Sequence, residues 1–305
     1  MSYLTQQIPL YETTQQISIQ WIYVVGRFSS FLNNISLTNK QLDDANIKIK
    51  NVVTSLNSHY WNIRSDSMNS MLVGSWGKGT YVRPPRDIDI LFLLPHDVYH
   101  RFSSRNGNIQ SQLLQEVKDV LFLRYSRTSI RGDGQVVVIP FNSFKIEVIP
   151  AFLSLNDEVI ICDSNNGGRY KQINPVTEIT AIDYSNYFSN GDTKNLIRML
   201  KHWQNTQNVP LKSFCLELLT MEFIETWKYK GMGLFWYDWM IRDFFNFLQT
   251  KANAHYTIGM NEYVFLGNEW LTKAKKAYNS AVQACEYERN NDYYLAHKHW
   301  YDIFG

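Results

Sequence analysis

Apolar residues recur at helical intervals in two stretches near the start of the chain. Segments 13–16 and 38–41 each have the spacing of a capping box, in which a Thr side chain and a Gln three residues later satisfy the first backbone groups of a helix. Apolar positions three or four residues apart follow both boxes. We therefore expect one amphipathic helix ending near Leu32 and a longer one ending near Tyr60, both acting as scaffold.

The period changes beyond residue 70, where short apolar runs bounded by Gly, Pro, Asn and Ser are typical of strands. The expected strands are residues 71–73, 88–94, 135–141 and 144–150. Asn142 and Ser143 separate the last two runs, which is the signal of a hairpin. A short helix is expected around residues 113–121.

From Asp192 onward the helical period dominates and strand signals nearly vanish. We therefore expect an α+β protein in which a mixed sheet with helices, residues 1–180, precedes a helical domain, residues 181–305. Hydrophobic residues make up 45% of the chain and aromatic residues 15%, so large cores are expected and disorder is not.

Charge and cysteine content exclude several classes of protein. Thirty Lys and Arg against 28 Asp and Glu leave a formal charge of +2, so strong nucleic-acid binding is not expected. The three cysteines lie far apart, which argues against a disulfide framework and a Cys-rich zinc site. No apolar run reaches the roughly 18 residues of a membrane span and no signal peptide is evident, so we expect a cytoplasmic protein with no membrane partner.

Asp87-Ile88-Asp89 is the first segment with chemical meaning. Alternate residues of a strand face the same side, so both carboxylates project together. Two like charges at this spacing repel, and a divalent cation that prefers oxygen ligands, Mg²⁺ or Mn²⁺, would hold them. Taken alone, however, such a pair is more typical of exposed aspartates at a strand end.

A third acid, Glu147, lies in an apolar run on the face opposite Phe144, Ile146 and Val148. Together with the two aspartates it would complete a site for two metal ions that catalyse an in-line displacement at phosphorus. Alternatively, it pairs with Lys or Arg on a neighbouring strand. Asp133, in a turn before the hairpin, is a less favoured third acid.

The Gly-rich segment 74–80 lies between the first two expected strands. Its glycines would let backbone N–H groups approach phosphate oxygens, while Ser75 adds a hydroxyl and Lys78 a positive charge. The segment does not have the spacing of a Walker A loop or of a dinucleotide-binding motif. As an isolated motif it is equally well a simple turn.

A Gly-Ser pair, a short spacer, Asp-x-Asp and a later third acid form the signature of the DNA polymerase β-like nucleotidyltransferases. This sequence resembles that superfamily through Gly74-Ser75, Asp87-x-Asp89 and Glu147. A closer resemblance covers most of the chain and points to bacterial CD-NTases of anti-phage CBASS defence, relatives of cyclic GMP-AMP synthase and 2′–5′ oligoadenylate synthetase. It rests on the runs 74–80, 83–89, 147–151 and 196–203.

The resemblance implies a polymerase β-like core and a C-terminal helical domain that form a two-lobed cleft. Asp87 and Asp89 would bind two Mg²⁺ or Mn²⁺ ions, and Glu147 would bind the catalytic ion and orient the attacking hydroxyl. Many members have Asp where this chain has the longer Glu147. Gly74 and Ser75 would contact the triphosphate of the donor nucleotide.

Further nucleotide-binding residues are implied in the helical half. Lys201 and Ser213 match positions that reach the phosphates, and Phe214 matches an aromatic residue that stacks on a base, although core packing is favoured for it in so apolar a helix. Arg198 lies with Lys194 and Lys201 on one face of the expected helix. This basic stripe would line the cleft, and its simpler interpretation is a solvated helix face.

The implied activity is the joining of ribonucleoside triphosphates, ATP and/or GTP, into a cyclic di- or trinucleotide that reaches a downstream effector, with release of pyrophosphate. Two alternatives stay open: a nucleotidyltransferase that modifies a small molecule or an RNA 3′ end, and an inactive scaffold with this fold. Some relatives are conjugated through a C-terminal glycine by a ubiquitin-like transfer enzyme, and Gly305 fits that role.

Overall fold

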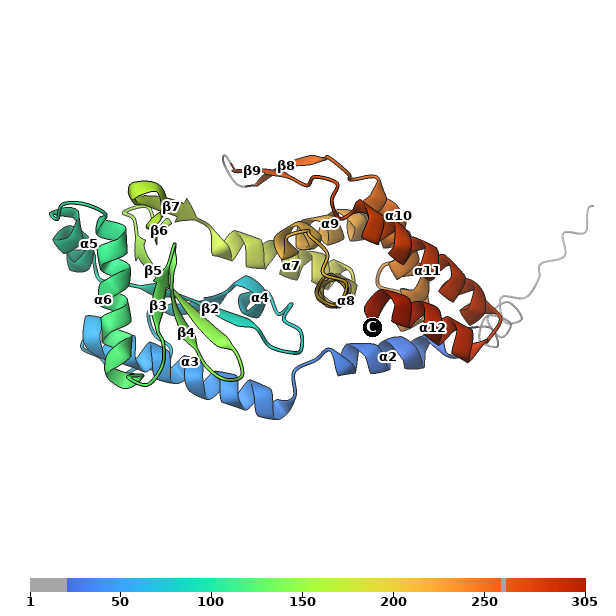
Figure 1. Ribbon diagram of the computed structural model, residues 1–305, viewed down its shortest axis with the longest axis horizontal. Coiled ribbons are helices and arrows are strands. Elements are labelled where there is room, and N and C mark those ends of the chain that lie inside the picture. The colour runs from blue at the N-terminus through green and yellow to red at the C-terminus, as the bar shows by residue number, and fades with distance from the viewer. Residues whose placement is uncertain (1–20, 259–261) are drawn as a thin grey trace, which may run out of the picture. The chain divides into compact units, whose positions relative to one another are not determined.

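A computed structural model describes residues 21–258 and 262–305, which divide into two compact units (Figure 1). Residues 36–183 form one, here called the sheet unit. Residues 21–35 and 184–305 form the other, here called the helical unit. Within the described residues, no helix is both long and apolar enough to cross a membrane.

The sheet unit contains a mixed seven-stranded sheet. Its strands are β1 (Ser70–Val73), β2 (Asp87–Leu93), β3 (Arg131–Asp133), β4 (Val136–Pro140), β5 (Lys145–Leu153), β6 (Val159–Asp163) and β7 (Arg169–Ile173). The main path runs β1-β2-β5-β4-β3, while β6 pairs with both β5 and β7. The β2–β5 pair is parallel and the other pairs are antiparallel. The expected hairpin is confirmed, because Pro140 of β4 pairs with Lys145 of β5.

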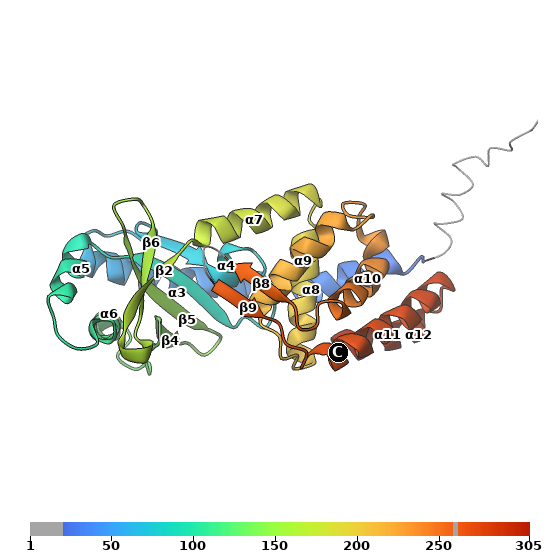
Figure 2. The ribbon, with the colours of Figure 1, turned by 90° about the horizontal axis from the view of Figure 1, so that it is seen from above.

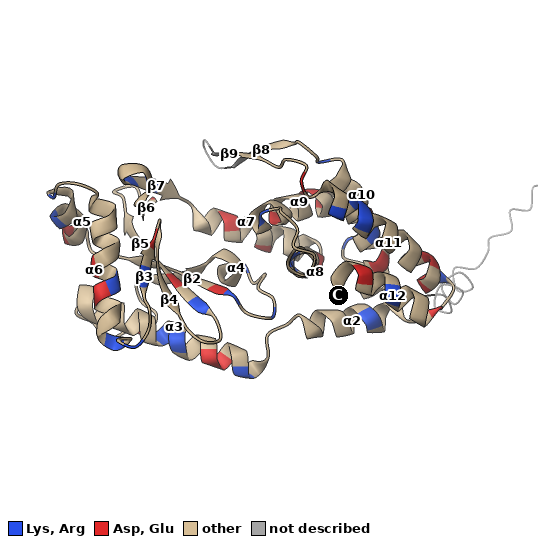
Figure 3. Ribbon diagram, viewed as in Figure 1, with Lys and Arg blue, Asp and Glu red and all other residues tan. Residues whose placement is uncertain are grey.

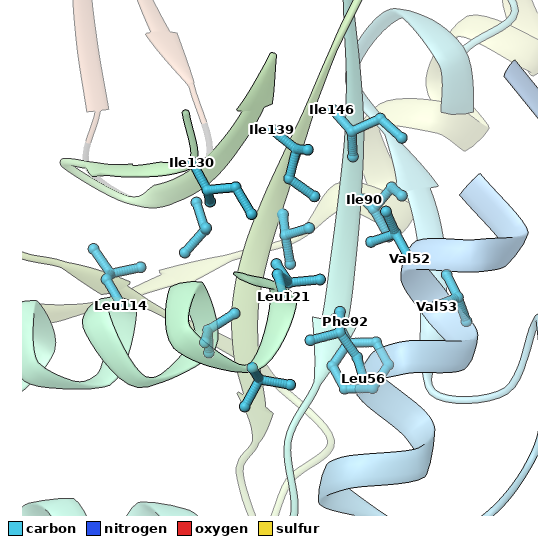
Figure 4. Packing of buried hydrophobic residues seen from close by; sticks show 14 of the residues in the cluster. Val52, Val53, Leu56, Ile90, Phe92, Leu114, Leu121, Ile130, Ile139 and Ile146 are labelled. Carbon is cyan, nitrogen blue, oxygen red and sulfur yellow. The ribbon is translucent and has the colours of Figure 1, made fainter. Parts of the chain in front are cut away.

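The helices of this part of the chain are α3 (Asn39–Tyr60), α4 (Gly74–Gly77), α5 (His96–Ser103), α6 (Ile109–Arg124), the short η1 (Asn165–Gly167) and α7 (Pro175–Phe188), which runs across the boundary between the units. Helices α3 and α6 pack on one face of the sheet. Leu56 of α3 and Leu121 of α6 pack with Ile90 of β2 and Ile146 of β5 in one core (Figure 4). All four side chains are inaccessible to solvent. The alternate positions of β2 and β5 therefore face away from this core.

The expected N-terminal helices are partly confirmed. Thr38 and Gln41 form the predicted capping box at the start of α3, which ends at Tyr60 as expected. The first helix, α2 (Val24–Asn34), begins later than expected, and Trp21 precedes it. The expected box at 13–16 lies outside the described residues.

The helical unit contains α2, α8 (Asp192–Thr206), α9 (Ser213–Thr226), η2 (Leu234–Trp236), α10 (Tyr237–Gln249), α11 (Leu271–Arg289) and α12 (Tyr293–Phe304). Helix α2 thus belongs to this unit, whereas the sequence pattern had grouped it with the sheet. The reason is packing: Phe28 of α2 contacts the rings of Tyr237 and Trp300 at centroid distances of 5.9 and 5.2 Å.

Two strands interrupt the region expected to be helical. β8 (His255–Ile258) and β9 (Glu262–Phe265) form an antiparallel hairpin (Figure 2). The prediction that almost everything beyond residue 192 is helical did not identify this hairpin. A two-stranded hairpin has no wide buried face, so it leaves only a weak alternation in the sequence.

Candidate active site

Asp87 and Asp89 lie on β2 with the geometry expected from the sequence. Burial alternates along the strand, with Ile88 and Ile90 inaccessible to solvent and both aspartates half-buried. The two carboxylates therefore project from the sheet face opposite the core that α3 and α6 cover.

The parallel pairing of β2 with β5 brings the third acid beside them. Asp89 pairs with Glu147, and Asp87 pairs with Lys145. Two like charges, Asp89 and Glu147, thus lie across from each other. Two residues along the strands, the unlike charges of Asp87 and Lys145 do the same. Figure 3 colours the acidic and basic positions along the ribbon, including those of this sheet. Asp133 is not part of this group, because it lies on the outermost strand of the main path, is exposed and pairs with Arg131 at 4.0 Å.

Lys145 connects two of the three acids. Its Nζ lies 3.2 Å from Asp87 Oδ1 and 2.8 Å from Glu147 Oε1. The hydrogen bond to Glu147 is the main cause of a raised pKa of Lys145. The alternative for Glu147 was a Lys or Arg partner on a neighbouring strand; its partner Lys145 lies instead two residues earlier on the same strand. The spacing K-x-E, with both side chains on one face, carried that signal.

Of the three acids, Asp89 is the one surrounded by excess negative charge. Burial raises the pKa of Asp89 to about 6, and the charges of Glu147 and Asp87 act in the same direction. Lys145 and Lys78 act against this shift. The site is therefore a place of concentrated negative charge that a further cation would stabilise.

The Asp89 carboxylate packs directly against Gly74. Val73 at the end of β1 pairs with Asp89, and Gly74 follows with a φ of +57°. A Cβ built on Gly74 would lie 2.1 Å from Asp89 Oδ2. Only glycine fits here, both because of the backbone conformation and because the carboxylate approaches so closely.

The first four residues of the Gly-rich segment, Gly74–Gly77, form the short helix α4 rather than an open turn. Ser75 lies in it, half-buried, and its carbonyl oxygen accepts a hydrogen bond from the Thr80 backbone. Lys78, considered above as a positive charge for phosphate, is buried and its Nζ lies 2.8 Å from Glu178 Oε2 on α7. Its ammonium group is thus directed to a structural ion pair.

The other expected site residues lie in the helical unit. Lys201 of α8 is buried and its Nζ lies 2.6 Å from Glu217 Oε1 of α9. Arg198 donates to the Leu32 carbonyl at 3.4 Å. Ser213, exposed at the start of α9, donates to Gln204 Oε1 at 2.7 Å.

Phe214 is half-buried, which is compatible both with core packing and with stacking on a base. At the end of α12, Phe304 is buried, while Gly305 is exposed and its N–H donates to the Tyr301 carbonyl at 2.8 Å. Use of Gly305 for conjugation stays a prediction.

The chemistry of the carboxylates suits a divalent cation, although no three His, Cys, Asp or Glu side chains in the described part of the chain converge on a ready-made metal site. Two of the acids already share one cation, the Lys145 ammonium. Asp89 pairs with Glu147 across the two strands, and the pKa of Asp89 is raised. As a set of oxygen ligands, the three carboxylates fit Mg²⁺ or Mn²⁺.

Known proteins resemble this chain in sequence and in fold. Residues 23–186, just over half of the chain, match the family model described as Second Messenger Oligonucleotide or Dinucleotide Synthetase domain. A protein described as a probable cyclic nucleotide synthase of Bacillus cereus strain VD146 is 20% identical over 273 residues, covering 76% of this chain and 80% of that protein.

Solved structures show the same fold at low sequence identity. The Vibrio cholerae di-nucleotide cyclase DncV, in complex with GTP and 5MTHFGLU2, matches with a TM-score of 0.72 at 12% identity, over 93% of this chain and 94% of that one. The Escherichia coli MS115-1 CdnC:HORMA-deltaN complex matches with a TM-score of 0.62 at 16% identity, over 92% and 96% of the chains. The α+β fold expected from the sequence is thereby confirmed. This chain belongs to the Second Messenger Oligonucleotide or Dinucleotide Synthetase family and is a nucleotidyltransferase.

Proposed function

We propose that this protein joins ribonucleoside triphosphates, ATP and/or GTP, into a cyclic di- or trinucleotide that acts as a second messenger in anti-phage defence. The observation that carries the proposal is that Asp87, Asp89 and Glu147 lie together on the paired strands β2 and β5. Gly74 packs against the Asp89 carboxylate. The name of the Bacillus cereus relative supports a cyclic product. The GTP bound to the Vibrio cholerae cyclase supports a nucleoside triphosphate substrate.

The three carboxylates would hold two Mg²⁺ or Mn²⁺ ions. When bound, such ions lower the pKa of the attacking ribose hydroxyl and stabilise the leaving pyrophosphate. Asp87 and Asp89 are fixed by the pleat of β2, so they present both carboxylates from one side of the sheet. Glu147 lies beside Asp89 and would orient the attacking hydroxyl.

The other residues that the family resemblance implies would bind and align the donor. Gly74 and Ser75 directly follow β1, at the level of Asp89, where the triphosphate is proposed to lie. At the start of α9, Ser213 is exposed and Phe214 is half-buried, and they would contact phosphate and base. Lys201 is proposed to act through Glu217, which lies one turn beyond Ser213, by positioning α9. Arg198, held by the Leu32 carbonyl, would exchange that contact for phosphate.

Incubation of the protein with Mn²⁺ or Mg²⁺ and four labelled ribonucleoside triphosphates tests the proposal. After phosphatase treatment, chromatography and mass spectrometry are expected to show a resistant cyclic product and to name its bases. Pyrophosphate release only with an added small molecule or RNA would contradict cyclic synthesis. It would indicate one of the alternative transferases.

A further inference from the structure

Lys145 occupies the position at which a cation is needed. Its ammonium group touches Asp87 and Glu147 at 3.2 and 2.8 Å, which are two of the three acids assigned to metal binding. β-strand geometry explains both contacts: Asp87 is its cross-strand neighbour in the β2–β5 register, and Glu147 is two residues along the same face. No rearrangement of the backbone is needed to form either.

We propose that Lys145 is a built-in placeholder cation that holds the catalytic carboxylates together before metal binds and has to leave when a divalent cation enters. This inference rests on the proposed function of the site. It assigns Lys145 a role as a positioning residue that competes with metal.

The exposure of the three side chains favours exchange. Lys145 and Asp87 are 40% and 41% exposed, and Glu147 is 20% exposed. Ion pairs with this access to water contribute little net stability, so a hydrated ammonium group can leave at small cost. Lysine also suits the role, because its flexible stem lets the charge swing into water without a change in the strand.

The arrangement of the carboxylates explains why a positive charge lies between them. Three carboxylates lie on two adjacent strands, and without a cation their mutual repulsion would spread them apart. The extra methylene of Glu147, compared with the Asp common in the family, lengthens the reach along the strand towards Lys145. A bound metal would meet carboxylates that are already gathered, but it would have to displace one positive charge.

The test is the affinity for Mn²⁺ alone, measured by electron paramagnetic resonance without nucleotide. Lys145→Met removes the charge at nearly constant length, while Lys145→Arg keeps it. Lys50→Met is the matched control, since Lys50 lies in the same unit and pairs at the surface with Asp66 at 3.2 Å. We expect Lys145→Met to bind Mn²⁺ about tenfold more tightly than the natural protein, and the other two variants to bind it no more tightly.

Thermal denaturation separates this role from a purely structural one. In EDTA, Lys145→Met is expected to melt below the natural protein, and Mn²⁺ is expected to raise its melting temperature by more. Unchanged or weaker Mn²⁺ binding by Lys145→Met would overturn the inference.

The nucleotide assay above separates the two proposals. A cyclic product from the natural protein with no change in Mn²⁺ affinity in Lys145→Met overturns the placeholder role alone. Tighter Mn²⁺ binding by the variant, with no product from the natural protein under any condition, overturns the proposed function alone.

Discussion

Lys145 of the sheet unit and Lys201 of the helical unit each form a short ion pair with a glutamate, yet their surroundings differ. Lys145 is 40% exposed and shared between two acids. Lys201 is 8% exposed and pairs with Glu217, which is 6% exposed. The first arrangement can exchange its cation with solvent, whereas the second joins α8 to α9 in the core. Burial rather than distance therefore separates a replaceable cation from a structural one.

Removal of the buried lysine is expected to have the largest effect on stability. Lys201→Met removes the ammonium group beside the buried Glu217 carboxylate, and breaking this buried ion pair costs about 3–5 kcal/mol of unfolding free energy. Lys145→Met is expected to cost less than about 1 kcal/mol, because its partners are hydrated. Urea denaturation of both variants measures the difference. Equal losses would contradict the comparison, and a double change of Lys201 to Met and Glu217 to Leu is expected to recover most of the loss.

A second contrast lies between two acids with raised pKa values. The pKa of Asp89 in the site reaches about 6, whereas burial raises the pKa of Asp238 at the start of α10 to about 8. The usual value is 3.8, so as pH rises from about 4 to 8 the unfolded chain releases a proton that folded Asp238 keeps. Stability is therefore lost as pH rises through this window, by at most about 1.4 kcal/mol per pH unit.

Asp238→Asn removes this loss. At each pH, the unfolding free energy of the variant is compared with that of the natural protein. The variant's advantage is expected to be larger at pH 8 than at pH 5, by roughly 2–4 kcal/mol. Denaturant titrations at the two pH values measure it. Equal gains at both would show that Asp238 is ionised in the folded protein.

A smaller effect on stability, but a selective one on the site, is expected at Gly74. Gly74→Ala places a methyl group against Asp89 and strains a left-handed backbone, at a cost of about 1–2 kcal/mol. Gly167→Ala is the control, since Gly167 also has a positive φ, +92°, but open space lies where its methyl group would be. Both variants are expected to melt earlier, and only Gly74→Ala to lose Mn²⁺ affinity. Equal Mn²⁺ affinities would show that Asp89 is seated independently of Gly74.

The sequence predicts the acids well because strand alternation is local. A period of two places Asp87 and Asp89 on one face, and the hairpin signal at residues 142–143 places β5 so that Glu147 can join them. The pairing of β2 with β5 is long-range, so the placement of Glu147 beside Asp89 needed the family resemblance or the structure.

Other features depend on tertiary contacts that no local pattern carries. Lys78 turns from the Gly-rich segment to Glu178, far along the chain, although the segment itself suggested phosphate. The assignment of α2 to the helical unit likewise depends on Phe28 meeting Tyr237 and Trp300. In both cases the residue types were compatible with several partners.

The carboxylates of β2 and β5 are proposed to form the catalytic centre of a cyclic nucleotide synthase, and one pair of variants tests this most directly. Product formation is measured for Asp89→Asn beside Asp133→Asn, which removes an exposed acid of the same sheet, with folding of both checked by circular dichroism. Asp89→Asn is expected to lose at least about 100-fold in rate, the loss that a disturbed outer-shell ligand alone can cause, and Asp133→Asn to keep full activity. Full activity in folded Asp89→Asn would contradict the claim.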